Sequence, residues 1–320
     1  MLPRITVENA RPGSLEILTG LWHRTWYASV SPEAHHAYRM RVLTTPWARR
    51  ACQVLALAEN GAVRSGMIVL SLPMRLNGRK LKVAGVAAVV TDPEHRGRGL
   101  AARLIAISHR RLADAGHDAA MLFTEIGTAY YAKLGYTSWP ITRYSLEVAD
   151  APAPGVTIRP ATARDVPAMV RLSAAFQQGY PLAFERTPAY LRHMMSRARG
   201  RDELFAAPGA RVRHVSGRWI AEAGGEPVAY ARVLPREGQL AITEAAFAPG
   251  RASALARLAV ERARAGGFPA LSVAGPASLP AALALPVTGT QAVDKMMMAP
   301  LAGGLSVAPV EHCFWSEDWF

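Results

Sequence analysis

The stretch VAAVVTDPEHRGRGLAARLIAISHRRLADAGHDAAMLF, residues 86–123, decides the fold of this chain. It reads as an apolar strand that ends at Pro93, a loop with Gly97 and Gly99, a helix with one apolar face, a glycine turn and a second strand. A strand–helix–strand unit of this kind belongs to a mixed sheet with helices packed on it. The segment therefore predicts an α/β fold.

The loop in this unit has the properties of an anion site. Glycines permit positive φ and let the backbone approach a ligand closely. A helix start offers unpaired N–H groups and a partial positive charge, and Arg96 and Arg98 add cationic donors. The loop has neither the Gly-Lys-Ser/Thr of a P-loop nor the G-x-G-x-x-G spacing of a dinucleotide site. We expect it to bind a pyrophosphate, although the loop alone leaves an ordinary strand–helix turn open.

Three stretches of the first half recur in the same order in the second half. The pairs are residues 5–22 with 156–176, 55–70 with 219–234, and 86–123 with 240–273. Shared order at a constant offset predicts two copies of one domain. The expected fold class is α/β, with two tandem domains, each a mixed twisted sheet flanked by helices. We place the domains at 1–150 and 157–302, with a linker at 151–156 and a tail at 303–320.

The second copy lacks the features of the anion loop. After Pro249 it reads GRASALARLA, with no R-G-x-G pattern. Without those glycines the backbone cannot easily wrap a pyrophosphate. We expect this domain to be non-catalytic and to form a wall of the acceptor site, an oligomer surface or simple support.

Two blocks of the first half together resemble the GNAT superfamily of N-acetyltransferases. Residues 89–101 match V-x-x-x-P-x-x-R-G-x-G-L-A, the acetyl-CoA motif, and TEIGTAYYAKLGYTSW (124–139) matches the Y-x-x-x-G-Y/F motif. Glu94 departs from the Gln or Arg common there, which removes one phosphate contact. The tandem arrangement and the tail EHCFWSEDWF (311–320) resemble bacterial enhanced-intracellular-survival acetyltransferases, which join an active GNAT domain to a degenerate one. LFTEIGTAYYAKLGY more weakly resembles fungal lysine N-acetyltransferases.

This resemblance implies that acetyl-CoA is the co-substrate and assigns its binding residues. The strand backbone at Val89, Val90 and Thr91 would pair with the pantetheine arm and contribute to an oxyanion site. The pyrophosphate would be held by the N–H groups of Arg96, Gly97, Arg98, Gly99, Leu100 and Ala101. Tyr131 would lie near the sulfur, and we expect it to be the general acid. The alternative for Tyr131 is a packing role only.

The base is open between two candidates. A lysine-like amine has a pKa near 10.4, so only roughly one molecule in a thousand is neutral near pH 7.4, and a proton must be removed before attack. Glu125 lies where the acceptor should enter, but it is equally explained as an acid at a helix start. In the enhanced-intracellular-survival enzymes the terminal carboxylate is the base, a role that falls here on Phe320. Aromatic and acidic side chains of the first helices are candidates to line the acceptor site: Trp22, Trp26, Tyr27, Glu33 and Tyr38. The alternative for Trp22 and Trp26, which are four residues apart, is a place in the core.

Composition excludes several classes of protein. The chain has 320 residues, 50% hydrophobic and 19% charged, which argues against disorder. No apolar run reaches the ~18 residues of a membrane span, no signal peptide is apparent, and two cysteines form neither a disulfide framework nor a metal site. We expect a cytoplasmic protein with no metal. The net charge of +13 is spread over the chain and suits a polyanionic cofactor more than nucleic acid.

The sequence therefore predicts an N-acetyltransferase that moves an acetyl group from acetyl-CoA to a primary amine of a small molecule. Lysine, polyamines, aminoglycoside-like compounds and protein amines remain open as acceptors, and so does a homo-oligomeric state. The alternative from another class is a non-catalytic acyl-CoA-binding or sensing protein built from two GNAT folds. It would bind acetyl-CoA without releasing thiol and would be indifferent to Tyr131→Phe.

Overall fold

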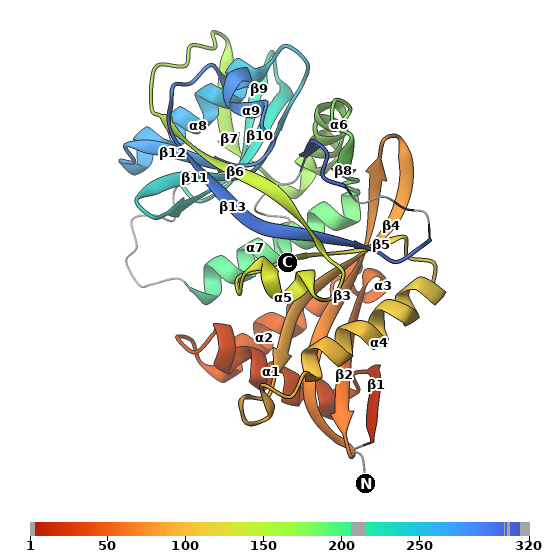
Figure 1. Ribbon diagram of the computed structural model, residues 1–320. Coiled ribbons are helices and arrows are strands. Elements are labelled where there is room, and N and C mark those ends of the chain that lie inside the picture. The colour runs from red at the N-terminus through yellow and green to blue at the C-terminus, as the bar shows by residue number, and fades with distance from the viewer. Residues whose placement is uncertain (1–3, 206–214, 304, 306–307, 314–320) are drawn as a thin grey trace.

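The computed structural model describes residues 4–205, 215–303, 305 and 308–313 (Figure 1). The first half contains β1 (Ile5–Asn9), α1 (Pro12–Trp26), α2 (Pro32–Leu43), α3 (Ala48–Ala51), β2 (Cys52–Glu59), β3 (Ala62–Leu76), β4 (Arg79–Thr91), a 3₁₀ turn (Pro93–His95), α4 (Leu100–Asp114), β5 (Ala119–Phe123), α5 (Thr128–Ala132) and β6 (Thr137–Glu147).

The second half repeats this order. It contains β7 (Val156–Pro160), a 3₁₀ turn (Ala163–Asp165), α6 (Val166–Gln177), β8 (Leu182–Phe184), α7 (Pro188–Leu204), β9 (Gly217–Ala223), β10 (Glu226–Arg236), β11 (Gln239–Phe247), α8 (Ala252–Gly266), β12 (Ala270–Ala274), α9 (Leu279–Leu283), β13 (Val287–Pro300) and β14 (His312–Cys313). The predicted α/β class with two similar halves is confirmed.

The described strands form one continuous mixed sheet in which the halves exchange their last strands. Its order is β1-β2-β3-β4-β5-β13-β6-β12-β11-β10-β9-β7. The end of β13, Met296–Pro300, pairs with β5 of the first half, and the end of β6, Arg143–Glu147, pairs with β12 of the second half. The limits of the two domains stay a prediction, because β6 and β13 have partners in both halves.

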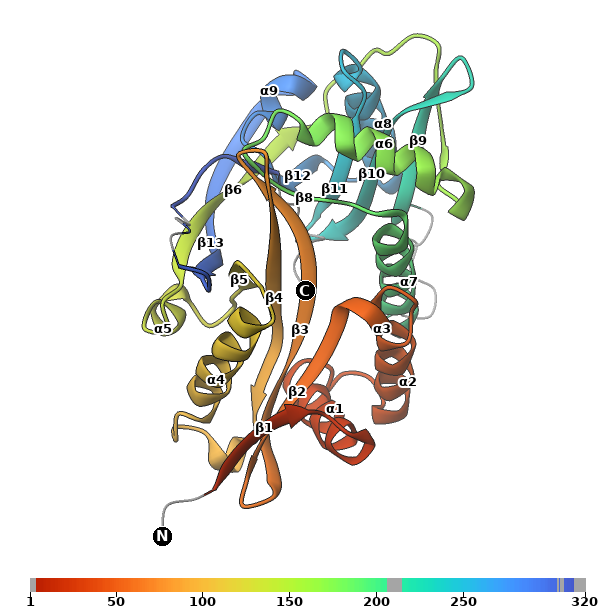
Figure 2. The ribbon, with the colours of Figure 1, turned by 90° about the vertical axis from the view of Figure 1, so that its right-hand side faces the viewer.

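Helices cover both faces of the first half of the sheet. Figure 2 shows α4 and α5 on one side of β3 and β4, with α1, α2 and α3 on the other. The predicted apolar face of α4 packs as its 3.6-residue period requires: Leu100 and Leu104 are buried, and Ile107 is half-buried. In the second half, α8 covers β9 to β12. Because α4 is anchored by its apolar face, its N-terminus is fixed at the open end of β4.

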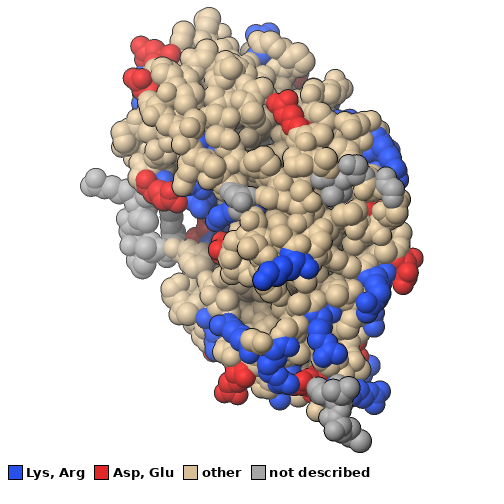
Figure 3. All heavy atoms as spheres, in the orientation of Figure 1, with Lys and Arg blue, Asp and Glu red and all other residues tan. Residues whose placement is uncertain are grey.

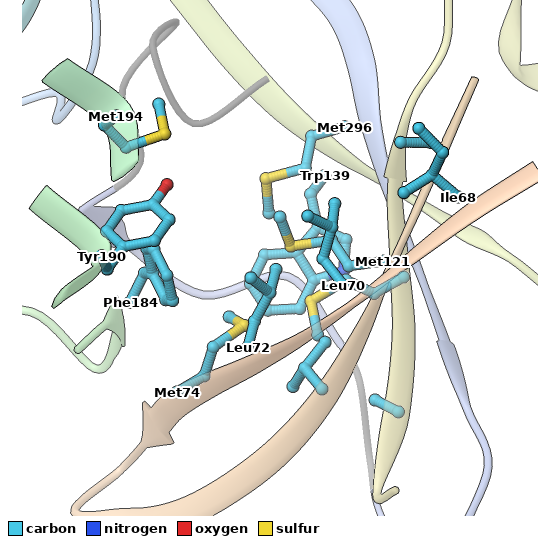
Figure 4. Packing of buried hydrophobic residues seen from close by; sticks show 14 of the residues in the cluster. Ile68, Leu70, Leu72, Met74, Met121, Trp139, Phe184, Tyr190, Met194 and Met296 are labelled. Carbon is cyan, nitrogen blue, oxygen red and sulfur yellow. The ribbon is translucent and has the colours of Figure 1, made fainter. Parts of the chain in front are cut away.

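The core of the first half contains side chains from the second half. Met194 and Tyr190 of α7 and Phe184 of β8 lie in one cluster with Trp139 of β6 and Met296 of β13 (Figure 4). All five are almost fully buried, and burial of each large apolar side chain stabilises the fold by about 1.5–3 kcal/mol. This shared core holds α7 beside α2 (Figure 2).

Candidate active site

Strands β4 and β5 pair over a short stretch and then separate. Their parallel pairing covers only Val83–Val86 of β4, although β4 continues to Thr91. Ala88 has a positive φ of 51°, and the β3–β4 register shifts beside it. The indole Nε1–H of Trp22 donates to the Ala88 carbonyl oxygen at 2.7 Å and holds this bulge. Beyond Val86, one edge of β4 therefore faces a cavity instead of β5.

The loop after β4 directs backbone donors toward the same cavity. Gly97 and Gly99 have φ values of 74° and 71°, which glycine adopts without penalty. The first helical bond of α4 runs from the Arg103 N–H to the Gly99 carbonyl oxygen, 3.0 Å. The N–H groups of Leu100, Ala101 and Ala102 consequently have no helical partner and carry the positive end of the helix dipole. This is a site suited to an anion.

Eight of the nine predicted cofactor-binding residues line the cavity, and Arg98 does not. The lining set is Val89, Val90, Thr91, Arg96, Gly97, Gly99, Leu100 and Ala101. The guanidinium of Arg98 instead pairs with Glu59 of β2 at 2.6 Å, so only its backbone remains for the loop. Arg96 Nε donates to the Thr91 carbonyl oxygen at 3.3 Å, which braces the loop against the end of β4.

The cavity has a volume of about 1270 Å³ and contains both described catalytic candidates. Tyr131 is 8% exposed on α5, packed edge-on against Tyr130 and Tyr136. Burial, with a smaller contribution from Tyr130, raises the pKa of Tyr131 to about 12. Glu125 lies on the exposed rim. Phe320 lies outside the described residues.

The remaining wall combines predicted and unpredicted residues. Trp26, Tyr27 and Tyr38 line the cavity as expected, whereas Trp22 lies beneath it in the core. The sequence did not reveal the part contributed by the second half: His193, Arg197, Arg201 and Phe205 of α7 with Leu234, Arg236, Thr243 and Lys295. No local motif marks these positions, because strand exchange and packing of α7 on α2 bring them there.

Metal ligands, membrane-spanning helices and charged surface patches are three further features that could indicate a function. No three His, Cys, Asp or Glu side chains are grouped there as metal ligands. No helix in these ranges is long and apolar enough to cross a membrane. Figure 3 shows Lys and Arg side chains gathered on the lower part of one face, where Figure 1 has α1 and α4.

Comparison with known proteins agrees with this geometry. Residues 6–138 match the acetyltransferase (GNAT) domain family. This match contains the whole anion loop and Tyr131. No curated protein matches the sequence.

Solved structures match nearly the whole chain in fold. A probable N-acyltransferase of Enterococcus faecalis V583 has a TM-score of 0.72 at 15% identity, over 93% of this chain and 73% of the other. Eis1 from Mycobacterium abscessus has 0.62 at 14%, over 93% and 74%. Saccharomyces cerevisiae N-myristoyltransferase, solved with bound myristoyl-CoA, has 0.56 at 10%, over 97% and 87%. At these identities the likeness establishes the fold alone.

Proposed function

We propose that this chain, with its GNAT acetyltransferase domain, transfers the acetyl group of acetyl-CoA to a primary amine of a small molecule. One observation carries the proposal: a single cavity is lined by the separated edge of β4, the donor loop before α4 and Tyr131. The first two would hold the pantetheine arm and the pyrophosphate. Tyr131 has no role in such binding, so its presence there favours catalysis.

The reaction is a direct attack on the thioester. The amine nitrogen bonds to the carbonyl carbon, the carbon–sulfur bond breaks, and the amide and CoA thiol are the products. The N–H groups at Val89 or Thr91 stabilise negative charge on the carbonyl oxygen. The amine loses a proton to Glu125, directly or through water, or to the carboxylate of Phe320. Tyr131 donates its phenolic proton to the departing sulfur and regains one from solvent.

The raised pKa of Tyr131 suits this role. A group that donates a proton must hold it before the reaction, and burial keeps the phenol protonated well above neutral pH. In addition, the Tyr131 hydroxyl has no hydrogen-bond partner in the described part of the chain, which leaves it available to the sulfur. We expect no loss of turnover from deprotonation of Tyr131 between about pH 7 and 10.

The test measures thiol release from acetyl-CoA with lysine, polyamines, aminoglycosides and short peptides. Tyr131→Phe should lower turnover by ~10²–10⁴-fold with little change in the KM for acetyl-CoA. Tyr180→Phe is the matched control, because Tyr180 lies in the corresponding cleft of the second half, and it should behave as wild type. A Tyr131→Phe enzyme within about threefold of wild type would refute the general-acid role. Tight acetyl-CoA binding without amine-dependent release would favour the sensing protein instead.

A further inference from the structure

The acceptor side of the cavity is basic. Its cationic side chains come from four elements: Arg39 (α2), Arg197 and Arg201 (α7), Arg236 (β10) and Lys295 (β13). Among the described lining residues the one acid is Glu125, which is exposed at the rim. Arg236 is paired with Glu237, but cations still outnumber acids among the described lining residues. Such an excess creates a positive potential that attracts anions and repels polycations.

Arg39 shows this imbalance most clearly. It is half-buried, with its guanidinium carbon 4.9 Å from the centre of the Trp22 ring and 5.7 Å from that of Tyr27. Its Nε is buried without a hydrogen-bond partner, and no carboxylate in the described ranges pairs with it. Elsewhere the fold gives buried arginines a carboxylate partner, since Arg186 and Arg218 both contact Glu244 and Arg232 contacts Asp202. A desolvated cation without a counter-ion is unfavourable, so Arg39 is arranged to meet an anion from outside the chain.

Arg201, on the neighbouring helix α7, adds a second cation to the lining of the cavity. It is half-buried and has no ion-pair partner among the described residues. Helices α2 and α7 are held together here, with Gly200 packed directly on Tyr38 and the Arg41–Glu203 ion pair at 2.8 Å. The two arginines thus belong to a fixed joint between the halves. Apolar side chains, Val42, Leu43, Ile68 and Leu70, line the cavity between this joint and the sheet.

We propose that the acceptor is an amine that also carries an oxyanion, a carboxylate or a phosphate, and that Arg39 and Arg201 bind this group. The inference rests on the proposed acetyltransferase function and narrows its substrate class. Arginine is suited to both oxyanions, because its planar fork of N–H donors matches their geometry. Polyamines and aminoglycosides carry extra ammonium groups that would face these arginines, so they are excluded as good acceptors.

The experiment compares amines that differ only in the anion. Lysine is paired with cadaverine, and phosphoethanolamine with ethanolamine; spermidine and an aminoglycoside complete the set. The oxyanion member of at least one pair should have a kcat/KM about 10- to 100-fold higher than its twin. The preferred pair distinguishes carboxylate from phosphate. If the anion-free twins or the polycations are used equally well or better, the inference is wrong while the acetyltransferase function stands.

Two variants locate the anion. Arg39→Gln and Arg201→Gln should each raise the KM for the oxyanion amine about tenfold or more and abolish the preference over the twin, with the KM for acetyl-CoA unchanged. Arg199→Gln is the control, because Arg199 is exposed on the same helix and does not line the cavity. A preference that survives both substitutions would overturn the assignment.

A binding measurement separates the two proposals. If no amine releases thiol, the acetyltransferase proposal fails, and calorimetric titration with the same paired amines then tests the anion site. Binding of phosphoethanolamine or lysine but not its twin, lost in Arg39→Gln, would support the site. Equal binding of both twins, or none of either, would overturn it.

Discussion

Counted back from Pro93 and Pro249, Ala88 on β4 and Glu244 on β11 stand at corresponding positions, five residues before each proline. At Ala88 the strand bulges, Trp22 holds its carbonyl, and a cavity of about 1270 Å³ opens. At Glu244 the strand also shifts register, but its carboxylate is buried between Arg186 and Arg218 at 2.8 and 2.6 Å, with the Tyr230 hydroxyl at 3.1 Å.

The cleft beside the β4 bulge is large, whereas the cleft beside the β11 bulge is small. The second cleft has only about 360 Å³ and is lined by aromatic and small residues, with the Tyr180 and Ser278 hydroxyls 2.7 Å apart at its edge. Its loop keeps Gly250 at a φ of 73°, but Arg251 at −113° stands where Gly99 begins α4. α9 carries no tyrosine where α5 carries Tyr131.

This comparison shows that the fold and the site depend on different residues. Both halves keep the apolar pattern that packs helices on the sheet, so both keep the architecture. A few positions at the open strand end decide whether a cleft binds a ligand. The second half keeps only a small cleft and contributes α7 to the wall of the first.

The largest expected effect is a loss of stability when the buried ion cluster of Glu244, Arg186 and Arg218 is broken. Glu244→Gln should lower the free energy of unfolding by about 3–5 kcal/mol, because it removes the buried carboxylate that pairs with Arg186 and Arg218. Burial alone would raise the pKa of Glu244, but Arg218 and Arg186 outweigh it and lower the pKa from 4.5 to about 2. Its contribution is therefore complete above about pH 4.5 and is lost as the pH falls toward 2.

Denaturant unfolding of both proteins from about pH 6 down to pH 3 measures this effect. The difference between wild type and Glu244→Gln should shrink across that range. A constant difference would mean that the carboxylate is not the stabilising group.

The next prediction compares the loop before α4 with the loop before α8 by the effect of a valine on acetyl-CoA kinetics. Gly99→Val should lower kcat/KM for acetyl-CoA ~100-fold, because a β-branched residue at a φ of 71° is strained and displaces the N–H groups that face the cavity. Gly250→Val places the same strain at a φ of 73° in the second loop and is the matched control. We expect similar losses of thermal stability in both variants, but an altered KM only for Gly99→Val. Equal kinetic effects would contradict the division of roles.

The smallest expected effect concerns the bulge. Trp22→Phe keeps most of the buried ring but removes the donor to the Ala88 carbonyl, so it should lower the free energy of unfolding by about 1–2 kcal/mol and raise the KM for acetyl-CoA. Trp26→Phe is the control, because Trp26 is 42% exposed and should cost less than about 0.5 kcal/mol. An unchanged KM in Trp22→Phe would show that the bulge does not shape the cleft.

The sequence alone determined the features that depend on neighbours along the chain. The glycines of the loop after β4, the amphipathic period of α4 and the Tyr131–Gly135–Tyr136 spacing specify local conformation, and each can be read in a short window. The repeat was visible for the same reason, because both halves need the same apolar pattern to form the same layers. The absence of the R-G-x-G pattern from the second copy could also be read from the sequence.

The tertiary structure decided which segments meet. The sequences of β6 and β13 do not predict that each strand pairs with the other half. Many strands with a similar apolar pattern could be neighbours, and the assembled sheet decides among them. That exchange and the shared core bring α7 against α2, so that Arg201 and Arg39 line the same cavity. The loop that faces the cofactor is local and was predictable, whereas the wall that faces the acceptor is built from residues far apart in sequence and exists only in the folded chain.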